Sequence, residues 1–91
     1  MLYPFASDGV YDIGISEIQI IDGIKQIRVM KEEPNWETGH FKIVNFLLPS
    51  KKILSNKGYT EEENNELIND MSNIQDVLFE VSEDYRKGIL D

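Results

Sequence analysis

His40 is the only histidine in this chain of 91 residues. Its imidazole titrates near neutral pH, so it is the first side chain to consider as a general base or a metal ligand. A metal site needs several ligands at regular spacings, and the sequence contains no H-x-x-x-H, H-E-x-x-H or EF-hand pattern. Glycine-rich phosphate-binding motifs are absent as well, and no serine is marked as an activated nucleophile. We therefore predict a protein that is not an enzyme, with no catalytic residues, no metal ligands and no cofactor.

Acidic residues are the other chemically useful group, and they are concentrated in the last third of the chain. Residues 60–91 hold ten acidic and two basic residues, whereas residues 1–59 hold seven of each. The net charge of −8 therefore belongs to the C-terminal segment. A surface of this sign repels nucleic acid backbones and anionic membranes and attracts basic proteins. We expect a basic protein surface as the partner, and no direct binding of nucleic acid or membranes.

Seven residues are predicted to contact that partner. Six are acids on a predicted C-terminal helix, where like charges three or four residues apart cost a few tenths of a kcal/mol per pair. A basic partner would relieve this repulsion, although an ordinary solvated helix face is the alternative. The seventh is the single tryptophan, which either anchors the interface or folds back over the core. The predicted contact residues are Trp36, Glu62, Glu66, Asp70, Asp76, Glu80 and Asp84.

The helix that positions these acids has clear sequence signals. Thr60 and Glu63 form an S/T-x-x-E capping box, and Gly88 follows the pattern as a C-terminal stop. Between them, apolar residues recur every three or four positions, as on one face of an amphipathic helix. We predict one long helix over residues 61–87, with Ser72 and Asn73 as the place where it would kink. The apolar seam comprises Leu67, Met71, Ile74, Leu78, Val81 and Tyr85, widened by Ile68 and Val77.

Residues 16–30 predict a β-hairpin around Asp22-Gly23, a dipeptide that accepts the positive φ angles of a type I′ turn. A register that faces Ile21 with Ile24 places apolar pairs on one face of the hairpin and polar pairs on the other. The further pairs in this register are Gln19 with Gln26, Ile18 with Ile27, and Glu17 with Arg28. Upstream, the apolar residues Ile13 and Ile15 lie at odd-numbered positions, whereas Ile18 and Ile20 lie at even-numbered positions. A continuous strand would therefore need a bulge or bend near Gly14 to bring both sets to one face.

The middle of the chain predicts one further strand. Residues 40–48 are apolar at both parities, which is typical of a central strand buried on both faces. Residues 31–39 are predicted to form a loop, because Pro34 cannot donate the backbone hydrogen bond that a central strand requires. Ile53 and Leu54 belong either to a short extra strand or to a packed loop. For residues 1–12 an irregular conformation remains open.

Together these elements predict a single α+β domain spanning residues 1–91. Its small antiparallel sheet, made of the hairpin plus a third strand, would pack against one long C-terminal amphipathic helix. The chain has no cysteine, so disulfides and thiolate metal sites are excluded, and a reducing cytoplasm is the simplest location. The first residues do not resemble a secretory signal, and no apolar run approaches the ~18 residues of a membrane span.

Two resemblances bear on function. The run Ile27-Arg28-Val29-Met30, the acidic loop, the segment His40-Phe41-Lys42-Ile43 and the strand–turn–helix that follows resemble a family of small uncharacterised bacterial domains. Members carry a His-Phe-His-Val-type strand motif and often sit near toxin–antitoxin genes, which implies an accessory role there. The family's second histidine falls on Lys42, so only His40 matches a site built on two histidines. The chain is also similar in type to small acidic inhibitors encoded by phages and mobile elements.

The function expected from the sequence is non-catalytic binding. We expect a small acidic interaction protein that binds and regulates a basic partner, such as a defence or nucleic-acid-processing enzyme inhibited by a phage or mobile element. Two alternatives remain open: a structural homodimer joined through its helix seam or an open sheet edge, and a toxin–antitoxin-associated accessory protein.

Overall fold

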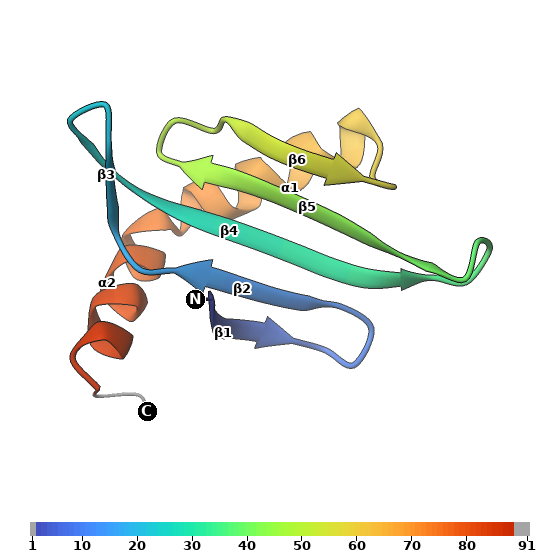
Figure 1. Cartoon of the computed structure of the whole chain (residues 1–91), viewed down its shortest axis with the longest axis horizontal. Coiled ribbons are helices and arrows are strands. Elements are labelled where there is room, and N and C mark those ends of the chain that lie inside the picture. The colour runs from blue at the N-terminus through green and yellow to red at the C-terminus, as the bar shows by residue number, and fades with distance from the viewer. Residues whose placement is uncertain (1, 89–91) are drawn as a thin grey trace.

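The computed structural model describes residues 2–88, which form a sheet of six strands with two helices on one of its faces (Figure 1). The strands precede the helices in the chain, so the predicted α+β class is confirmed. The strands are β1 (Leu2–Ser7), β2 (Asp12–Ser16), β3 (Gln19–Ile21), β4 (Ile24–Asn35), β5 (His40–Leu48) and β6 (Ile53–Lys57). The helices are α1 (Glu61–Asn73) and α2 (Gln75–Arg86).

The sheet is larger than the three strands predicted from the sequence. Its order is β1-β2-β4-β5-β6 with every pairing antiparallel, and β3 adds to the first part of β4. The long strand β4 therefore occupies the centre, a position that the sequence patterns assigned to β5. Of the β5 residues, Val44, Phe46 and Leu48 are buried under the helices, whereas Phe41 is exposed, so burial on both faces was wrong for the start of this strand.

The hairpin prediction is confirmed at the turn. Ile21 pairs with Ile24 and Gln19 pairs with Gln26, and both turn residues, Asp22 and Gly23, have positive φ angles. The ladder ends at Gln19, so the two further predicted pairs of this hairpin lie outside it.

The bend that separates the odd-numbered from the even-numbered apolar positions occurs after Ser16, where β2 ends, and not near Gly14 as predicted. The Ser16 hydroxyl explains the position of this bend. Its Oγ accepts the backbone N–H of Arg28 at 2.8 Å and donates to the carbonyl of Glu17 at 2.8 Å. A side chain thus supplies bonds that a continuous ladder would otherwise have made, and the chain can turn from β2 into β3.

Strands replace part of one predicted loop and most of the N-terminal segment for which an irregular conformation was left open. The predicted loop at residues 31–39 is confirmed for residues 36–39, which form a turn, and was wrong for residues 31–35, because β4 continues to Asn35 with Pro34 paired to Phe41. Pro34 is tolerated there since β4 pairs with β2 only as far as Glu32, and beyond it β4 has β5 as its one neighbour. The N-terminal residues form β1, an edge strand on which Pro4 is likewise acceptable.

The prediction of one long helix was also wrong. The helix stops at Asn73, directly after the expected kink site, and Ile74 serves as the C-cap of α1 and the N-cap of α2. The predicted apolar seam is therefore buried only in part. Ile74 and Val77 are 36% and 49% exposed, whereas Leu78 is completely buried.

The core lies between the helices and the inner face of the sheet. It combines strand residues with Tyr59 and with residues of both helices. Its buried members are Ile13, Ile15, Ile27, Val29, Val44, Phe46, Leu48, Tyr59, Leu67, Ile68 and Leu78. Within residues 2–88, neither helix is long and apolar enough to cross a membrane.

Helix α2 is fastened to the sheet by specific polar and aromatic contacts. The buried Ser82 hydroxyl donates to the carbonyl of Ser16 at 2.8 Å. The Tyr85 ring stacks on Tyr3 with centroids 4.7 Å apart, and the Tyr85 hydroxyl donates to the carbonyl of Pro4 at 2.9 Å. These contacts join the end of the chain to β1 and β2.

Candidate functional site

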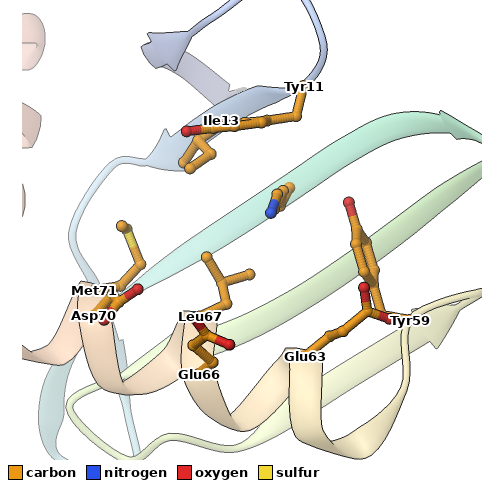
Figure 2. Close-up of a pocket in the computed structure, with 9 residues that line it drawn as sticks. Tyr11, Ile13, Tyr59, Glu63, Glu66, Leu67, Asp70 and Met71 are labelled. Atoms are coloured by element: carbon orange, nitrogen blue, oxygen red, sulfur yellow. The ribbon is translucent and has the colours of Figure 1, made fainter.

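A cleft of about 250 Å³ lies between α1 and the inner face of the sheet (Figure 2). One wall consists of α1 residues, and the opposite side consists of residues in or next to β2 and β4. The lining residues are Tyr11, Ile13, Lys31, Tyr59, Glu63, Glu66, Leu67, Asp70 and Met71. The cleft thus joins three carboxylates, one ammonium group and two phenol rings.

The first turn of α1 sets one end of the cleft. The Thr60 Oγ1 accepts the backbone N–H of Glu63 at 3.1 Å, and a Glu63 carboxylate oxygen accepts the backbone N–H of Thr60 at 2.9 Å. This capping box, predicted from the sequence, starts the helix directly after Tyr59. The side-chain amide of Asn56 also donates to the Tyr59 carbonyl at 2.9 Å. Tyr59 is therefore held firmly between β6 and α1.

Gly58, just before Tyr59, is required by the close approach of β5. Its φ angle is +95°, and a Cβ atom there would lie 2.8 Å from Cγ of Lys42. A larger residue would therefore be strained and would also displace the Lys42 side chain. The path of the chain into the cleft depends on this glycine.

Lys31 brings a cation to the inner face of the sheet. Its strand neighbours in register are Ile13 and Val44, both buried, so the Lys31 side chain points toward the helices. Its ammonium nitrogen lies 4.5 Å from the ring centroid of Tyr11 and 5.5 Å from that of Tyr59. It makes no hydrogen bond or ion pair with any residue in the range 2–88. Cation–π contacts alone hold this ammonium group in place.

A second lysine neutralises Glu63. The Lys42 ammonium lies 3.5 Å from the Glu63 carboxylate and 3.8 Å from that of Glu33. The bond from the Thr60 backbone, followed by the positive charge of Lys42, lowers the pKa of Glu63 below its ordinary value. Glu63 therefore has local partners, which distinguishes it from the other acids on α1.

The Tyr59 hydroxyl is buried without a hydrogen-bond partner among the described residues. The residue is only 7% exposed, and Figure 2 shows its hydroxyl turned away from α1 toward the strands. Burial raises the pKa of Tyr59, and the Glu33 carboxylate adds to the effect as a weak acceptor that does not reach regular hydrogen-bond geometry, and through its negative charge. The hydroxyl is consequently protonated at neutral pH and offers a hydrogen-bond donor, not a base. The side-chain oxygen of Asn64 is also buried without a partner in this part of the chain.

The six predicted acids divide between the two helices. Glu66 and Asp70 line the cleft, and Glu62 lies one helical turn before them on α1. Asp76, Glu80 and Asp84 lie on α2 and do not contribute to the cleft. None of these six carboxylates has a basic nitrogen within 4.0 Å among residues 2–88.

Trp36 lies at the tip of the β4–β5 hairpin, which extends beyond the sheet (Figure 1). Its side chain is 87% exposed, so the alternative in which it covers the core was wrong. It lines a shallow depression with Lys42 and Gly58, close to the start of α1. The acids of α2 lie at the other end of the molecule, so Trp36 and the six acids do not form one compact patch.

His40 is exposed at the first position of β5, and its backbone N–H donates to the Thr38 hydroxyl at 3.3 Å. In the described part of the chain, no three histidine, cysteine, aspartate or glutamate side chains converge as a metal site would require. Lys42, at the position of the second histidine in the resembling family, forms ion pairs with Glu33 and Glu63.

Sequence reasoning missed Lys31, Tyr59 and Tyr11, which lie far apart in the chain. One signal was present for Lys31. It continues the alternation of Ile27 and Val29, both buried, so its parity places a charge on the apolar face of β4. Tyr11 likewise continues the alternation of Ile13 and Ile15, both buried, whereas Tyr59 lies outside regular strands and helices and carries no comparable periodicity.

No protein-family model matches the chain, and no curated protein or solved structure is detectably similar to it. The function must therefore be argued from the geometry of the chain itself.

Proposed function

We propose that this protein is a non-catalytic binding protein that docks the acidic face of its two helices onto a basic surface of a partner protein. The observation that carries the proposal is the set of six helical carboxylates without basic partners among the described residues. The acids recur every fourth residue, as Glu62, Glu66 and Asp70 on α1 and as Asp76, Glu80 and Asp84 on α2.

This arrangement is unfavourable in the isolated protein. Carboxylates four residues apart lie on the same side of a helix, about one turn from each other, and each such pair costs a few tenths of a kcal/mol. The one ion pair within either helix is between Arg86 and Glu83, at 3.0 Å. Arg86 therefore pairs with an acid that belongs to neither row. A partner that brings basic residues to the rows would remove the repulsion and gain long-range attraction.

The partner proposed is a protein whose basic surface normally binds nucleic acid, and the outcome of docking is inhibition or regulation of that protein. A row of carboxylates competes directly for lysine and arginine side chains that otherwise contact phosphates. Trp36 provides a further contact, because an exposed tryptophan on a projecting hairpin can be buried against a partner at low conformational cost.

The experiment compares three forms of the protein as capture reagents in lysate of the source cell. One form carries Glu62→Lys, Asp76→Lys and Glu80→Lys. These substitutions replace exposed acids of the two rows that do not line the cleft. The matched control carries Asp12→Lys, Glu17→Lys and Glu37→Lys, exposed acids outside the helices that give the same change in net charge. Association rates with the captured protein are then measured at low and moderate salt.

The helix triple variant is expected to associate at least about tenfold more slowly than wild type at low salt, with a weaker dependence on salt. The control variant is expected to stay close to wild type. An equal loss in both variants would mean that net charge, and not the helical face, governs binding, and the proposal would be rejected.

A structural homodimer is the second candidate, and β6 favours it. This short strand forms one edge of the sheet, all five of its residues are exposed, and Ile53 and Leu54 are the large apolar residues among them. Edge strands of this kind can pair with a second copy. Sedimentation of wild type and of Leu54→Lys over a dilution series tests the idea: a dimer that the substitution dissociates supports it, and a monomer at every concentration excludes it.

A further inference from the structure

Two hydrogen-bond donors in the cleft lack partners among the described residues. The first is the Tyr59 hydroxyl, which is buried and protonated. The second is the Lys31 ammonium group, which contacts aromatic rings alone. Leaving a buried hydroxyl unpaired is costly, and a ligand that supplies an acceptor group would remove that cost. The two donors together suit a carboxylate.

Two acceptors lie on the opposite wall of the same cleft. Glu66 and Asp70 are one helical turn apart on α1, and Figure 2 shows both next to Leu67 and Met71 along the wall. Their carboxylates have no ion pair within the range 2–88, whereas the neighbouring Glu63 is already paired with Lys42. These two acids suit an ammonium group.

The space between the donors and the acceptors is small and partly apolar. Ile13, Leu67 and Met71 separate the polar groups, and the cleft volume of about 250 Å³ lies below the range of pockets for drug-sized ligands. A ligand of amino-acid size with a carboxylate at one side and an ammonium group at the other would match the cleft in size and in polarity.

We propose that this cleft binds a small zwitterion of the free amino acid class. The ligand carboxylate accepts hydrogen bonds from the Lys31 ammonium and the Tyr59 hydroxyl, and the ligand ammonium lies against Glu66 and Asp70. This proposal shares Glu66 and Asp70 with the docking function above, but it does not depend on that function, since its evidence is the cleft and the two donors opposite these acids.

The charges of the cleft also select among amino acids. Lys42 is shared between Glu63 and Glu33, so the carboxylates in and beside the cleft, Glu33, Glu63, Glu66 and Asp70, exceed the ammonium groups of Lys31 and Lys42 by two negative charges. A zwitterion with an additional positive charge reduces this excess, whereas one with an additional negative charge increases it. Arginine and lysine should therefore bind better than glycine, and glutamate should bind worst.

The test is isothermal titration of the full chain with four probes: arginine, glycine, glutamate and agmatine, which is arginine without its carboxylate. Arginine is expected to bind most tightly. At moderate salt, which screens the extra net positive charge of agmatine, agmatine is expected to bind at least about tenfold more weakly, because it cannot use the two donors. If agmatine binds as tightly as arginine, the cleft recognises a cation and not a zwitterion, and the proposal is overturned.

Two variants locate the binding within the cleft. Tyr59→Phe keeps the ring but removes one donor, so it is expected to weaken arginine about threefold to tenfold and to leave agmatine unchanged. Tyr85→Phe is the matched control, because its hydroxyl bonds to the carbonyl of Pro4 outside the cleft. Equal effects of the two substitutions, or no binding of arginine to wild type at millimolar concentration, would also overturn the proposal.

The outcome is independent of the docking experiment. The double variant Asp76→Lys and Glu80→Lys changes α2 alone and leaves Glu66, Asp70, Lys31 and Tyr59 unchanged, so it is expected to bind arginine within about twofold of wild type. Loss of arginine binding in that variant would place the ligand outside the cleft. Tyr59→Phe, in turn, leaves all six helical acids in place and should capture the protein partner normally.

Discussion

The two helices lie on the same face of one sheet, but they are attached to it in different ways. Helix α2 buries Leu78 completely, donates a buried hydrogen bond from Ser82 and stacks Tyr85 on Tyr3. Helix α1 also buries apolar residues, yet it borders a cleft and two buried polar atoms, on Tyr59 and Asn64, that have no hydrogen-bond partner within residues 2–88.

This difference separates the parts of the molecule that supply stability from the part that is available for binding. An unpaired buried polar group costs about 1–3 kcal/mol, so a fold selected for stability alone would pair or remove it. The satisfied contacts of α2 offset that cost. Binding sites are commonly found where local stability has been sacrificed in this way.

The largest effect should come from removing a core side chain under α2. Leu78→Ala is expected to lower the free energy of unfolding by about 2–5 kcal/mol, because it leaves a cavity in a fully buried site. Leu67→Ala, next to the cleft on α1, should cost less, since Leu67 already borders open space. Urea denaturation of both variants measures the two losses in unfolding free energy. A greater loss for Leu67→Ala would contradict the assignment of stability to α2 and of binding to α1.

The next effect concerns the hydrogen bond between α2 and β2. Ser82→Ala removes a buried donor to the Ser16 carbonyl and is expected to cost about 1–2 kcal/mol in the same measurement. Ser72→Ala on α1 is the matched control, because the Ser72 side chain makes no hydrogen bond within the described residues. Alanine favours helix more than serine does, so the control should be neutral or slightly stabilised.

A third pair of variants compares two tyrosine hydroxyls directly. Tyr59→Phe removes a buried hydroxyl that no residue in the described part of the chain pairs, and is expected to raise the free energy of unfolding by up to about 1 kcal/mol. Tyr85→Phe removes a hydroxyl that donates to the carbonyl of Pro4 and should lower it by about 0.5–1 kcal/mol. Thermal unfolding of the two proteins, measured without ligand, should therefore shift in opposite directions. Shifts of the same sign in the unfolding temperature would show that the Tyr59 hydroxyl does not destabilise the folded protein.

The smallest effect is expected in the acid dependence of stability. Glu63 has a lowered pKa in the folded protein, mainly through the Thr60 backbone, so its stabilising contribution is present above its ordinary pKa of 4.5. The contribution is lost as pH falls through the lower folded value. Glu63→Gln should therefore flatten part of the decline in stability below about pH 5. Glu62→Gln, which accepts no hydrogen bond from a described residue, should leave the decline unchanged, and a similar flattening there would contradict this assignment.

The parts of the fold that could be predicted from the sequence depend on residues close together in the chain. The capping box of Thr60 and Glu63 spans four residues, and the turn at Asp22-Gly23 fixes its own register. Both motifs satisfy backbone groups locally, so no distant contact is needed to recognise them.

The features that could not be predicted depend on neighbours from elsewhere in the fold. Pro34 can lie in a strand because β2 ends before reaching it, a fact that no local pattern contains. The helix break was foreseen as a kink and the burial of Leu78 was expected, but the exposure of Ile74 follows from its position at the break and from packing on the sheet. The cleft was missed because β2, β4 and α1 each contribute a few residues to it. The acids of α1 were recognised, whereas the donors opposite them were not.

The exposed position of Trp36 has a practical consequence for spectroscopy. It is the sole tryptophan of the chain, and 87% of its side chain is exposed at the hairpin tip. Its indole fluorescence should already have the long emission wavelength of a water-exposed ring, so unfolding should change that wavelength little. A partner that covers the hairpin should shift the emission to shorter wavelength. The protein therefore carries a natural optical probe that is nearly insensitive to its own unfolding but reports the arrival of a partner.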